Sequence, residues 1–566
     1  MVKLHRFKIN KVILAIFFWF LISRIWGINF GLPFIYHPDE GKLIYSAFYA
    51  ASNFLKPDTY LHPILLSYLL IPVFFIQYIL GLILGIYHSP FSFYVAYLSD
   101  PTIFIILGRI FSLLVSLGCA SLVLVIGNRF FGQKTALTAL FLLSSSFLFT
   151  KESHYIKEET LSSLFLLVTF YFVLKVFETV KERKRSLIFL GISLGLAVST
   201  KIIYFPISLI VLLLYFFKKI NIKELIGVLV LSILAYIATN PYIILDSQRF
   251  IQSNIDLVLK HRMIGPSLNY QPVWFGYIKD QLFPAFGLSS SFIYLLALIT
   301  SISGKLGKKA FIASFSVLTI FLGIILAGGN FPRWAVAMIP FLSLTSAVFL
   351  WRIVKNFYLI LIIIILISSN NLIRTLKFDF LISQPDTRTI SKNWIEKNIP
   401  ANSKIVVEGA VGDSVPSFEG PPLVLSKFRL LALYNQAQSL GLPAQNLLAT
   451  LEVSQDKVGY DLIGVPTLDQ TSNQKIVDTD SYQVQGVEYL IVSSWAHRDN
   501  QGFDKTFLSS LNKNYLLVNQ FTPTFVFDND PHGWRVDYQA LDKVKFLKDI
   551  QFGPVISIYQ LKQEEK

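Results

Sequence analysis

Two pairs of adjacent carboxylates lie beside long apolar segments of the sequence. Asp39 and Glu40 occur in the stretch YHPDE, and Glu158 and Glu159 occur in SHYIKEET. A carboxylate at such a position could act as a general base that takes the proton from an attacking hydroxyl group. Each pair also has a plainer interpretation, because Asp39 is a favourable helix N-cap and acidic residues in a first turn stabilise the helix dipole.

Three cationic residues lie at the edges of apolar segments or inside them. Arg333 begins the segment RWAVAMIPFL, Lys201 lies in AVSTKIIYF, and Arg109 lies inside IFIILGRIFSLL. An arginine can hold a phosphate through two hydrogen bonds, but a cationic side chain near a membrane surface can also simply extend to water. Arg109 is deeper in its segment, so it needs an anionic or carbonyl partner. All three residues are candidates for binding a phosphate group.

Carboxylates beside cations at a membrane surface suit the transfer of a group from a lipid phosphate. The cations would bind the phosphate while the lipid tail stays in the bilayer, and a carboxylate would activate the hydroxyl group of an acceptor. Because a phosphate is a good leaving group, a separate general acid is less necessary. One base is then sufficient for an inverting displacement.

The composition places these residues in a membrane protein. Of the 566 residues, 53% are hydrophobic and only 15% are charged, and the mean hydropathy is +0.55. Soluble domains of this length rarely carry so little charge, so the sequence predicts a polytopic α-helical membrane protein. The formal net charge of +15 is typical of basic cytoplasmic loops, and no nucleic-acid partner is expected. The single cysteine, Cys119, excludes an intrachain disulfide.

Twelve apolar runs are candidates for membrane crossings. They cover residues 12–30, 64–86, 103–127, 135–150, 160–177, 186–200, 202–217, 224–243, 287–303, 310–327, 332–350 and 356–372. If all twelve crossed, the basic loops would lie opposite the basic N-terminus, against the positive-inside rule. The pattern becomes consistent if 64–86 lies along the outer surface or re-enters the bilayer. We therefore expect eleven crossings of the plasma membrane, with a cytoplasmic N-terminus and both acidic pairs outside.

The apolar pattern ends near Asn371, which predicts a membrane domain over 1–373 and an extracytoplasmic soluble α/β domain over 374–566. In the second domain we expect a helix at DTRTISKNWIEKNIP and strands at KIVVEG, GVEYLIVSSW and GPVISIYQL. It contains no Ser/His/Asp set, phosphate loop or metal-ligand spacing. Recognition of an acceptor and covering of the site are both open roles for it.

Six segments, in this order, resemble the GT-C superfamily of glycosyltransferases that use lipid-phosphate sugars, near the protein O-mannosyltransferases and the aminoarabinose transferases of lipid A. The segments are HPDE with FLKPDTYLHPILLSYLL, LGRIFSLLVSLGCASLVLVIGNRFFG, HYIKEETLSSLFLL, GLAVSTK, NPY and FPRWAVAMIPFL. Together they span most of residues 1–370. The resemblance implies a GT-C-like fold with amphipathic helices in the first external loop. It also implies transfer of a hexose or pentose from a dolichyl- or undecaprenyl-phosphate donor to an acceptor protein, lipid or glycan.

The same resemblance implies roles for the acidic residues. Asp39 matches the catalytic base of the family, and Glu40 is its neighbour. Glu159 falls on a second acidic position, which positions the acceptor or assists the base. The match is imperfect there, because His154 stands where the family usually has arginine and Glu159 stands where it has aspartate.

The cationic residues and the histidines complete the expected site. By resemblance, Arg333 contacts the donor phosphate, and Lys201 is a second candidate for this contact. One branch of the superfamily, the oligosaccharyltransferases, binds a divalent cation, and His37, His62 and His154 could join the acids around one. Their spacing is no recognised ligand pattern, so a divalent cation is not favoured and no metal cofactor is expected.

Contacts to the substrate are expected from four residues. His37 and His154 lie next to the acidic pairs, and Tyr270 and Trp274 lie in the long loop 241–286. The aromatic side chains of this loop could cover a sugar, or they could form an interfacial aromatic belt in contact with membrane lipids.

Two other functions fit parts of the pattern. A transporter or flippase of lipid-linked sugars would bind near the bilayer midplane and usually shows inverted repeats. No internal repeat is evident, and the acids lie at the surface, which favours an enzyme. A non-catalytic scaffold would tolerate the replacement of Asp39.

Overall fold

The computed structural model describes most of the chain in two compact units. The described residues are 11–37, 39–60, 64–178, 182–264, 273–329, 331–408, 420–439, 445–454, 457–465, 479–494, 511, 513–527 and 538–562. The first unit comprises Met1–Ile28, Asp39–Phe74 and Ile106–Asp379. The second comprises Asn29–Pro38, Phe75–Ile105 and Phe380–Lys566, so it includes two stretches from the N-terminal part of the sequence. The expected boundary between 373 and 374 stays a prediction.

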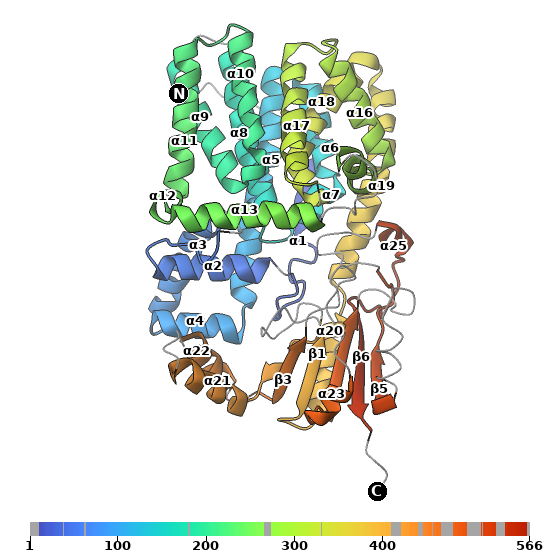
Figure 1. Cartoon of the computed structure of the whole chain (residues 1–566). Helices are drawn as coiled ribbons and strands as arrows, with labels where there is room; N and C mark the ends of the chain where they lie inside the picture. The colour runs from blue at the N-terminus through green and yellow to red at the C-terminus, as the bar shows by residue number, and fades with distance from the viewer. Residues whose placement is uncertain are drawn as a thin grey trace. The chain divides into compact units, whose positions relative to one another are not determined.

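The first unit consists of helices, some of which continue into the second unit. Its longer helices run side by side, and α2 and α13 lie across their ends (Figure 1). The helices are α1 (Lys11–Ile25), α2 (Glu40–Ser52), α3 (Leu65–Ile83), α5 (Thr102–Phe130), α6 (Gln133–Ser144), α7 (Phe147–Ser153), α8 (Glu158–Glu178), α9 (Arg183–Thr200), η1 (Ile202–Ser208), α10 (Leu209–Phe216), α11 (Ile222–Thr239), α12 (Tyr242–Leu245), α13 (Ser247–Ile264), α14 (Val273–Gly276), η2 (Tyr277–Leu282), α15 (Phe283–Phe286), α16 (Leu288–Ile302), α17 (Lys308–Leu326), η3 (Pro332–Met338), α18 (Ile339–Ile353) and α19 (Phe357–Ile382).

Seven spans within the described residues are long and apolar enough to cross a bilayer, and a bent pair would make an eighth. The seven are α3, α5, α8, α11, α17, η3 with α18, and α19. The pair joins Val273–Phe286 to Leu288–Ile302 with a bend of 118°. The predicted polytopic helical membrane protein is thereby confirmed.

The count of eleven crossings stays a prediction. The expected runs over 12–30, 135–150, 186–200 and 202–217 form α1, α6 with α7, α9, and η1 with α10, which are shorter or more polar than the seven spans. The run over 64–86, expected along the surface, forms α3, whose 19 residues are long enough to cross.

Glycines bring together the helices whose ends carry the site. A Cβ at Gly195 of α9 would overlap the carbonyl oxygen of Ser232 in α11, and a Cβ at Gly323 of α17 would overlap the carbonyl oxygen of Ile203 in η1. Such small residues allow close backbone approach between helices in a membrane. The close packing fixes the end of α9, where Lys201 lies, and η1 next to it.

The second unit contains a six-stranded sheet in the order β2-β3-β1-β4-β6-β5. The first four strands of this order are parallel and the last two are antiparallel to their neighbours. Its elements are α4 (Pro90–Ser99), α20 (Thr387–Asn398), β1 (Lys404–Glu408), β2 (Val424–Leu425), α21 (Lys427–Ser439), α22 (Gln445–Val453), β3 (Gly459–Val465), α23 (Thr479–Val484), β4 (Tyr489–Ser494), β5 (Tyr515–Phe521), α25 (Tyr538–Lys543) and β6 (Val555–Leu561).

The helix and strands that the sequence predicted in this unit contribute buried apolar residues to one core. Ile395 of α20 packs with Ile405 of β1, Ile491 of β4 and Ile556 of β6, all of them nearly inaccessible to solvent. These strands are apolar because the parallel part of such a sheet is covered on its faces. The α/β arrangement, the helix α20 and the strands β1, β4 and β6 are thereby confirmed.

Candidate functional site

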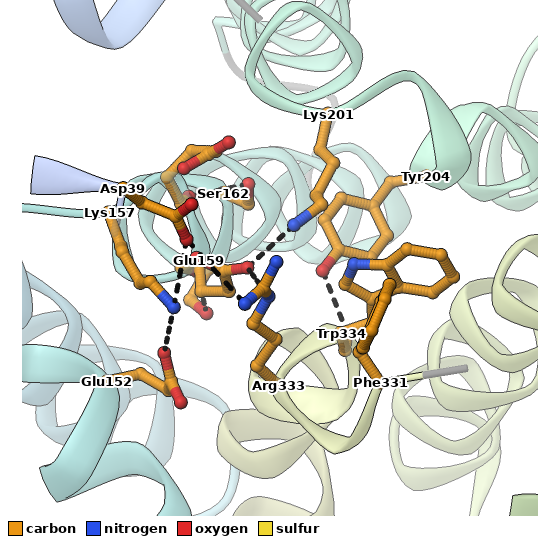
Figure 2. A network of polar contacts seen from close by, with 12 residues as sticks. Asp39, Glu152, Lys157, Glu159, Ser162, Lys201, Tyr204, Phe331, Arg333 and Trp334 are labelled. Carbon is orange, nitrogen blue, oxygen red and sulfur yellow. Dashed lines mark hydrogen bonds and ion pairs between the residues drawn. The ribbon is translucent and has the colours of Figure 1, made fainter. Parts of the chain in front are cut away.

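Arg333 lies between the two carboxylates that the sequence singled out. Its Nη1 is 3.6 Å from Oδ2 of Asp39, and its Nε is 3.6 Å from Oε1 of Glu159 (Figure 2). Asp39 directly precedes α2, Glu159 lies in the first turn of α8, and Arg333 lies in η3. Three segments that are far apart in the sequence therefore supply one cluster of charges.

Two lysines extend this cluster on opposite sides. Lys201, at the end of α9, places Nζ 2.6 Å from Oε1 of Glu159. Lys157 places Nζ 3.4 Å from Oδ2 of Asp39 and 3.3 Å from Oε2 of Glu152 (Figure 2). We call Asp39, Glu152, Lys157, Glu159, Lys201 and Arg333 the charge network.

The backbone near Lys201 and Arg333 is held by one hydrogen bond between two short helices. The hydroxyl group of Tyr204 in η1 donates to the carbonyl oxygen of Trp334 in η3 over 2.8 Å. Tyr204 follows Lys201 by three positions, and Trp334 follows Arg333 directly. The bond therefore joins the two segments that carry these cations.

The exposed fractions of the side chains show which part of the network a substrate can reach. Asp39, Arg333 and Lys201 are 16%, 15% and 11% exposed, whereas Glu159 and Lys157 are only 2% and 1% exposed. The first three can contact a ligand directly. The other two are nearly inaccessible and contact their charged neighbours.

Arg333 has unused capacity to donate hydrogen bonds. Both of its contacts to carboxylates, at 3.6 Å, are longer than a hydrogen bond. Among the residues that the structure describes, Nε and Nη1 of Arg333 are buried without a hydrogen-bond partner. A buried donor without a partner is costly, so this guanidinium is suited to an anion that enters the site.

Lys157 keeps positive charge beside Asp39. Burial and the neighbouring Arg333 lower the pKa of Lys157, but Glu152, Asp39 and Glu159 outweigh them and raise the pKa above its ordinary value. Lys157 is therefore a cation at neutral pH, and its ammonium group lies beside the Asp39 carboxylate. An ionised carboxylate is the form that a general base requires.

The side chain of Asp39 does not cap helix α2, although the sequence also allowed that role. Asp39 occupies the N-cap position of α2, but its side chain makes no capping hydrogen bond. Its carboxylate instead faces Lys157 and Arg333. The geometry therefore favours chemistry over helix capping at this position.

Glu40, the next residue, is engaged differently. Its Oε1 and Oε2 accept hydrogen bonds of 2.9 and 2.7 Å from Nε and Nη2 of Arg109, and both side chains are at most 2% exposed. The backbone N–H of Ile156 also donates to Glu40 over 3.1 Å, and Arg109 donates to the carbonyl oxygen of Ile28 over 2.6 Å. The predicted catalytic role of Glu40 and phosphate contact of Arg109 have no support in this geometry, because each buried charge neutralises the other.

His154, expected to touch the substrate, lies inside the protein. Its Nδ1 is 2.9 Å from the carbonyl oxygen of Thr150, and its Nε2 is 3.2 Å from that of Trp26 and 3.3 Å from Oδ1 of Asp379. The side chain is only 1% exposed. These contacts join the segment before α8 to the ends of α1 and α19, so they support a structural role.

The structure describes two of the other expected substrate contacts, Trp274 and His37. Trp274 lies in α14 and is half exposed, and His37 is buried in the second unit. Tyr270 and His62 lie outside the described residues. No group of three or more His, Cys, Asp or Glu side chains that could hold a metal ion occurs in the part that the structure describes.

Two members of the charge network, Glu152 and Lys157, were not predicted from the sequence. Both lie in the stretch TKESHYIKEE, between two apolar helices. Five charged residues within ten positions at a membrane surface were a signal that more than the last two glutamates matter. Their burial, at 0% and 1% exposure, is what the sequence did not indicate.

One protein family matches part of the sequence. Residues 97–245 match the model of the dolichyl-phosphate-mannose-protein mannosyltransferase family, which here includes Glu152, Lys157, Glu159 and Lys201. No curated protein has a significantly similar sequence.

Among solved structures, ArnT from Cupriavidus metallidurans bound to undecaprenyl phosphate is similar, with a TM-score of 0.51 and 12% identity over 97% of each chain. The apo form of that protein gives a TM-score of 0.50 and 11% identity, again over 97% of each chain. The Archaeoglobus fulgidus oligosaccharyltransferase in its apo form gives a TM-score of 0.49 and 12% identity over 98% of this chain and 89% of its own.

The comparison with ArnT confirms the fold that the resemblance to the GT-C superfamily implied. The match extends over almost the whole of both chains, so it includes the C-terminal α/β region as well as the helices. Together with the family model, it relates the chain to the membrane glycosyltransferases of that superfamily.

Proposed function

We propose that this protein transfers a sugar from a polyprenyl-phosphate donor to the hydroxyl group of an acceptor protein, lipid or glycan. The observation that carries the proposal is the position of Arg333 between Asp39 and Glu159, with hydrogen-bond donors that no described residue uses. The shared fold with ArnT, whose structure was solved with undecaprenyl phosphate, supports a donor of this class.

In the proposed reaction Asp39 is the general base. Its carboxylate takes the proton from the acceptor hydroxyl group, whose oxygen attacks the anomeric carbon of the sugar. The bond from this carbon to the phosphate oxygen breaks, and polyprenyl phosphate leaves with the electron pair. The attack inverts the anomeric carbon, and the proton passes from Asp39 to solvent.

The cations would stabilise the charge that develops on the departing phosphate. Arg333 and Lys201 are partly exposed and can contact it, and a guanidinium suits two phosphate oxygens at once. Glu159 would keep both cations in place, because Lys201 bonds to it and Arg333 lies beside it. Since these cations supply positive charge, we propose that the transfer needs no divalent metal.

The network also supports the expected topology. Asp39 and Glu159 face the same arginine, so both lie on one side of the membrane. An even number of crossings must therefore separate them, and if α5 and the pair α6–α7 each cross once, α3 does not cross. We propose that this side is the outer face of the plasma membrane, with a cytoplasmic N-terminus and an extracytoplasmic C-terminal domain.

Analysis of co-purified lipid tests the proposal. The protein is purified in mild detergent, and its lipid extract is searched by mass spectrometry for polyprenyl phosphates and their glycosylated forms. We expect a polyprenyl phosphate at a level that the variant Arg333→Ala reduces. Incubation of the protein with a glycosylated polyprenyl phosphate and an acceptor extract should release the free lipid phosphate, whereas a transporter would leave the donor intact.

A further inference from the structure

The turn after α2 exposes two apolar side chains on a backbone of unusual conformation. Phe54 is 96% exposed and Leu55 is 46% exposed, and their φ angles are +53° and +63°. Residues with a side chain adopt this left-handed region at a cost, and here two follow each other. Such strain persists only where the surrounding structure holds it, and it is common at functional positions.

Two tyrosine hydroxyl groups hold this turn. Tyr242 donates to the carbonyl oxygen of Phe54 over 3.0 Å, and Tyr68 donates to that of Leu55 over 2.5 Å. The turn also satisfies backbone N–H groups, because Leu55 donates to the carbonyl of Ala50 over 2.8 Å and the next residue donates within the turn over 2.9 Å. In hydrocarbon, where water provides no partner, backbone groups must be satisfied inside the protein in this way.

A second segment is joined to the turn and is also apolar on its outside. Asp246 accepts a 3.0 Å hydrogen bond from the hydroxyl group of Tyr60 and lies 3.7 Å from the Lys56 ammonium. Directly before Asp246, Ile244 and Leu245 are 64% and 70% exposed. We call Phe54, Leu55, Ile244 and Leu245 the apolar tip.

The position of the tip along the chain places it at the membrane boundary. The α11 helix, one of the seven candidate spans, ends at Thr239, only three residues before Tyr242. Two cations flank the tip: Lys56 follows Leu55, and Arg249 lies over the ring of Tyr60. Basic residues beside an apolar surface favour a bilayer with anionic headgroups.

We infer that the apolar tip inserts into the acyl chains of the leaflet at the C-terminal end of α11, while Lys56 and Arg249 contact anionic lipid headgroups. The α2 helix connects the tip to Asp39, and its 13 residues span about 20 Å. Because the helix is rigid, a tip held in the leaflet fixes the height of Asp39 near the headgroups. This last consequence rests on the proposed function, but the insertion itself does not.

The depth of a spin label in vesicles tests the insertion without donor or acceptor. Phe54→Cys is labelled in a Cys119→Ser background and reconstituted into vesicles of phosphatidylethanolamine and phosphatidylglycerol. Two matched sites set the scale: Ile365→Cys on the exposed side of α19, and Val484→Cys, 89% exposed in the C-terminal unit. Collisions of each label with oxygen, which is concentrated in lipid, and with a water-soluble nickel chelate give its depth.

We expect the label at Phe54 to resemble the one at Ile365, with higher accessibility to oxygen than to the chelate. A label at Ile244→Cys should give the same result and covers the case in which labelling at Phe54 prevents folding. Accessibility to the chelate as high as at Val484 would overturn the inference. So would protection from the chelate that appears only when undecaprenyl phosphate is added, because the tip would then belong to a donor site. Since no turnover is measured, failure here is distinct from failure of the proposed transferase.

Discussion

Glu40 and Arg109, 69 positions apart in the sequence, form a buried ion pair with two parallel hydrogen bonds of 2.9 and 2.7 Å. The ion pairs of the preceding residue, Asp39, with Lys157 and Arg333 are longer, at 3.4 and 3.6 Å. Asp39 and Glu40, which are adjacent acids in the sequence, therefore have different roles. The pair at Glu40 holds the start of α2 in place, and Asp39 remains accessible for chemistry.

We expect Glu40→Gln to lower stability rather than to affect only turnover. It leaves the buried charge of Arg109 without a counter-ion, which typically costs about 3–5 kcal/mol. Thermal unfolding in detergent, followed by intrinsic fluorescence, should show a lower midpoint. The double variant Glu40→Gln/Arg109→Gln should recover part of the loss. A Glu40→Gln protein as stable as the wild type but inactive would instead assign Glu40 to catalysis.

Replacing Arg333 by alanine should weaken binding of the donor phosphate. Hydrogen bonds to a charged group contribute about 1.5–3 kcal/mol, which corresponds to an affinity lower by about 10- to 100-fold. Binding of undecaprenyl phosphate to the purified protein, measured by native mass spectrometry, provides the readout. Arg352→Ala, an exposed arginine at the end of α18, is the matched control and should bind like the wild type. Equal binding by both variants would remove Arg333 from the phosphate site.

Glu159→Gln should slow turnover less than a change at Asp39 does. The amide loses the charge that holds Lys201 at 2.6 Å, but it retains the shape of the side chain. The loss of one charge-assisted hydrogen bond of about 1.5 kcal/mol predicts roughly tenfold slower release of polyprenyl phosphate. Glu158→Gln, in the same turn, is the control. Complete inactivity of Glu159→Gln with normal donor binding would indicate that Glu159 is the base.

The predicted side of α3 can be tested with a cysteine at its end. Leu84 is 71% exposed directly after the helix, so Leu84→Cys in a Cys119→Ser background should be accessible. We expect a membrane-impermeant maleimide to label it from outside in intact cells. Labelling only after the membrane is opened would show that α3 crosses and that the count of eleven is wrong.

The sequence predicted the members of the site better than their contacts. Asp39, Glu159, Lys201 and Arg333 were all chosen from their place at the ends of apolar segments, and the structure brings them together. The pairing of Glu40 with Arg109 was not predicted. In a soluble helix the apolar face marks the interior, but a membrane helix is apolar on both its lipid side and its core side. Its rotation, and therefore its buried partners, cannot be derived from periodicity.

In the second unit, individual strands could be predicted from the sequence, but their order in the sheet could not. Strands β1, β4 and β6 were predicted because their apolar residues stand out against polar neighbours. The order of the strands depends on contacts between residues far apart in the chain, such as the parallel pairing of Ile405 with Leu462. Nothing local in the sequence marks such a pairing. The inclusion of residues 29–38 in this unit depends likewise on distant contacts, for example the 2.7 Å hydrogen bond between Tyr36 and Thr389.

The turnover of Asp39→Asn, with donor binding measured in the same preparation, tests the role of Asp39 as the base most directly. The amide cannot accept the proton of the acceptor, and the loss of a general base typically slows a reaction by about 10²–10⁴-fold. We predict release of polyprenyl phosphate slowed to that extent, with undecaprenyl phosphate bound as tightly as by the wild type. Full turnover by Asp39→Asn would contradict the assignment of Asp39 as the base.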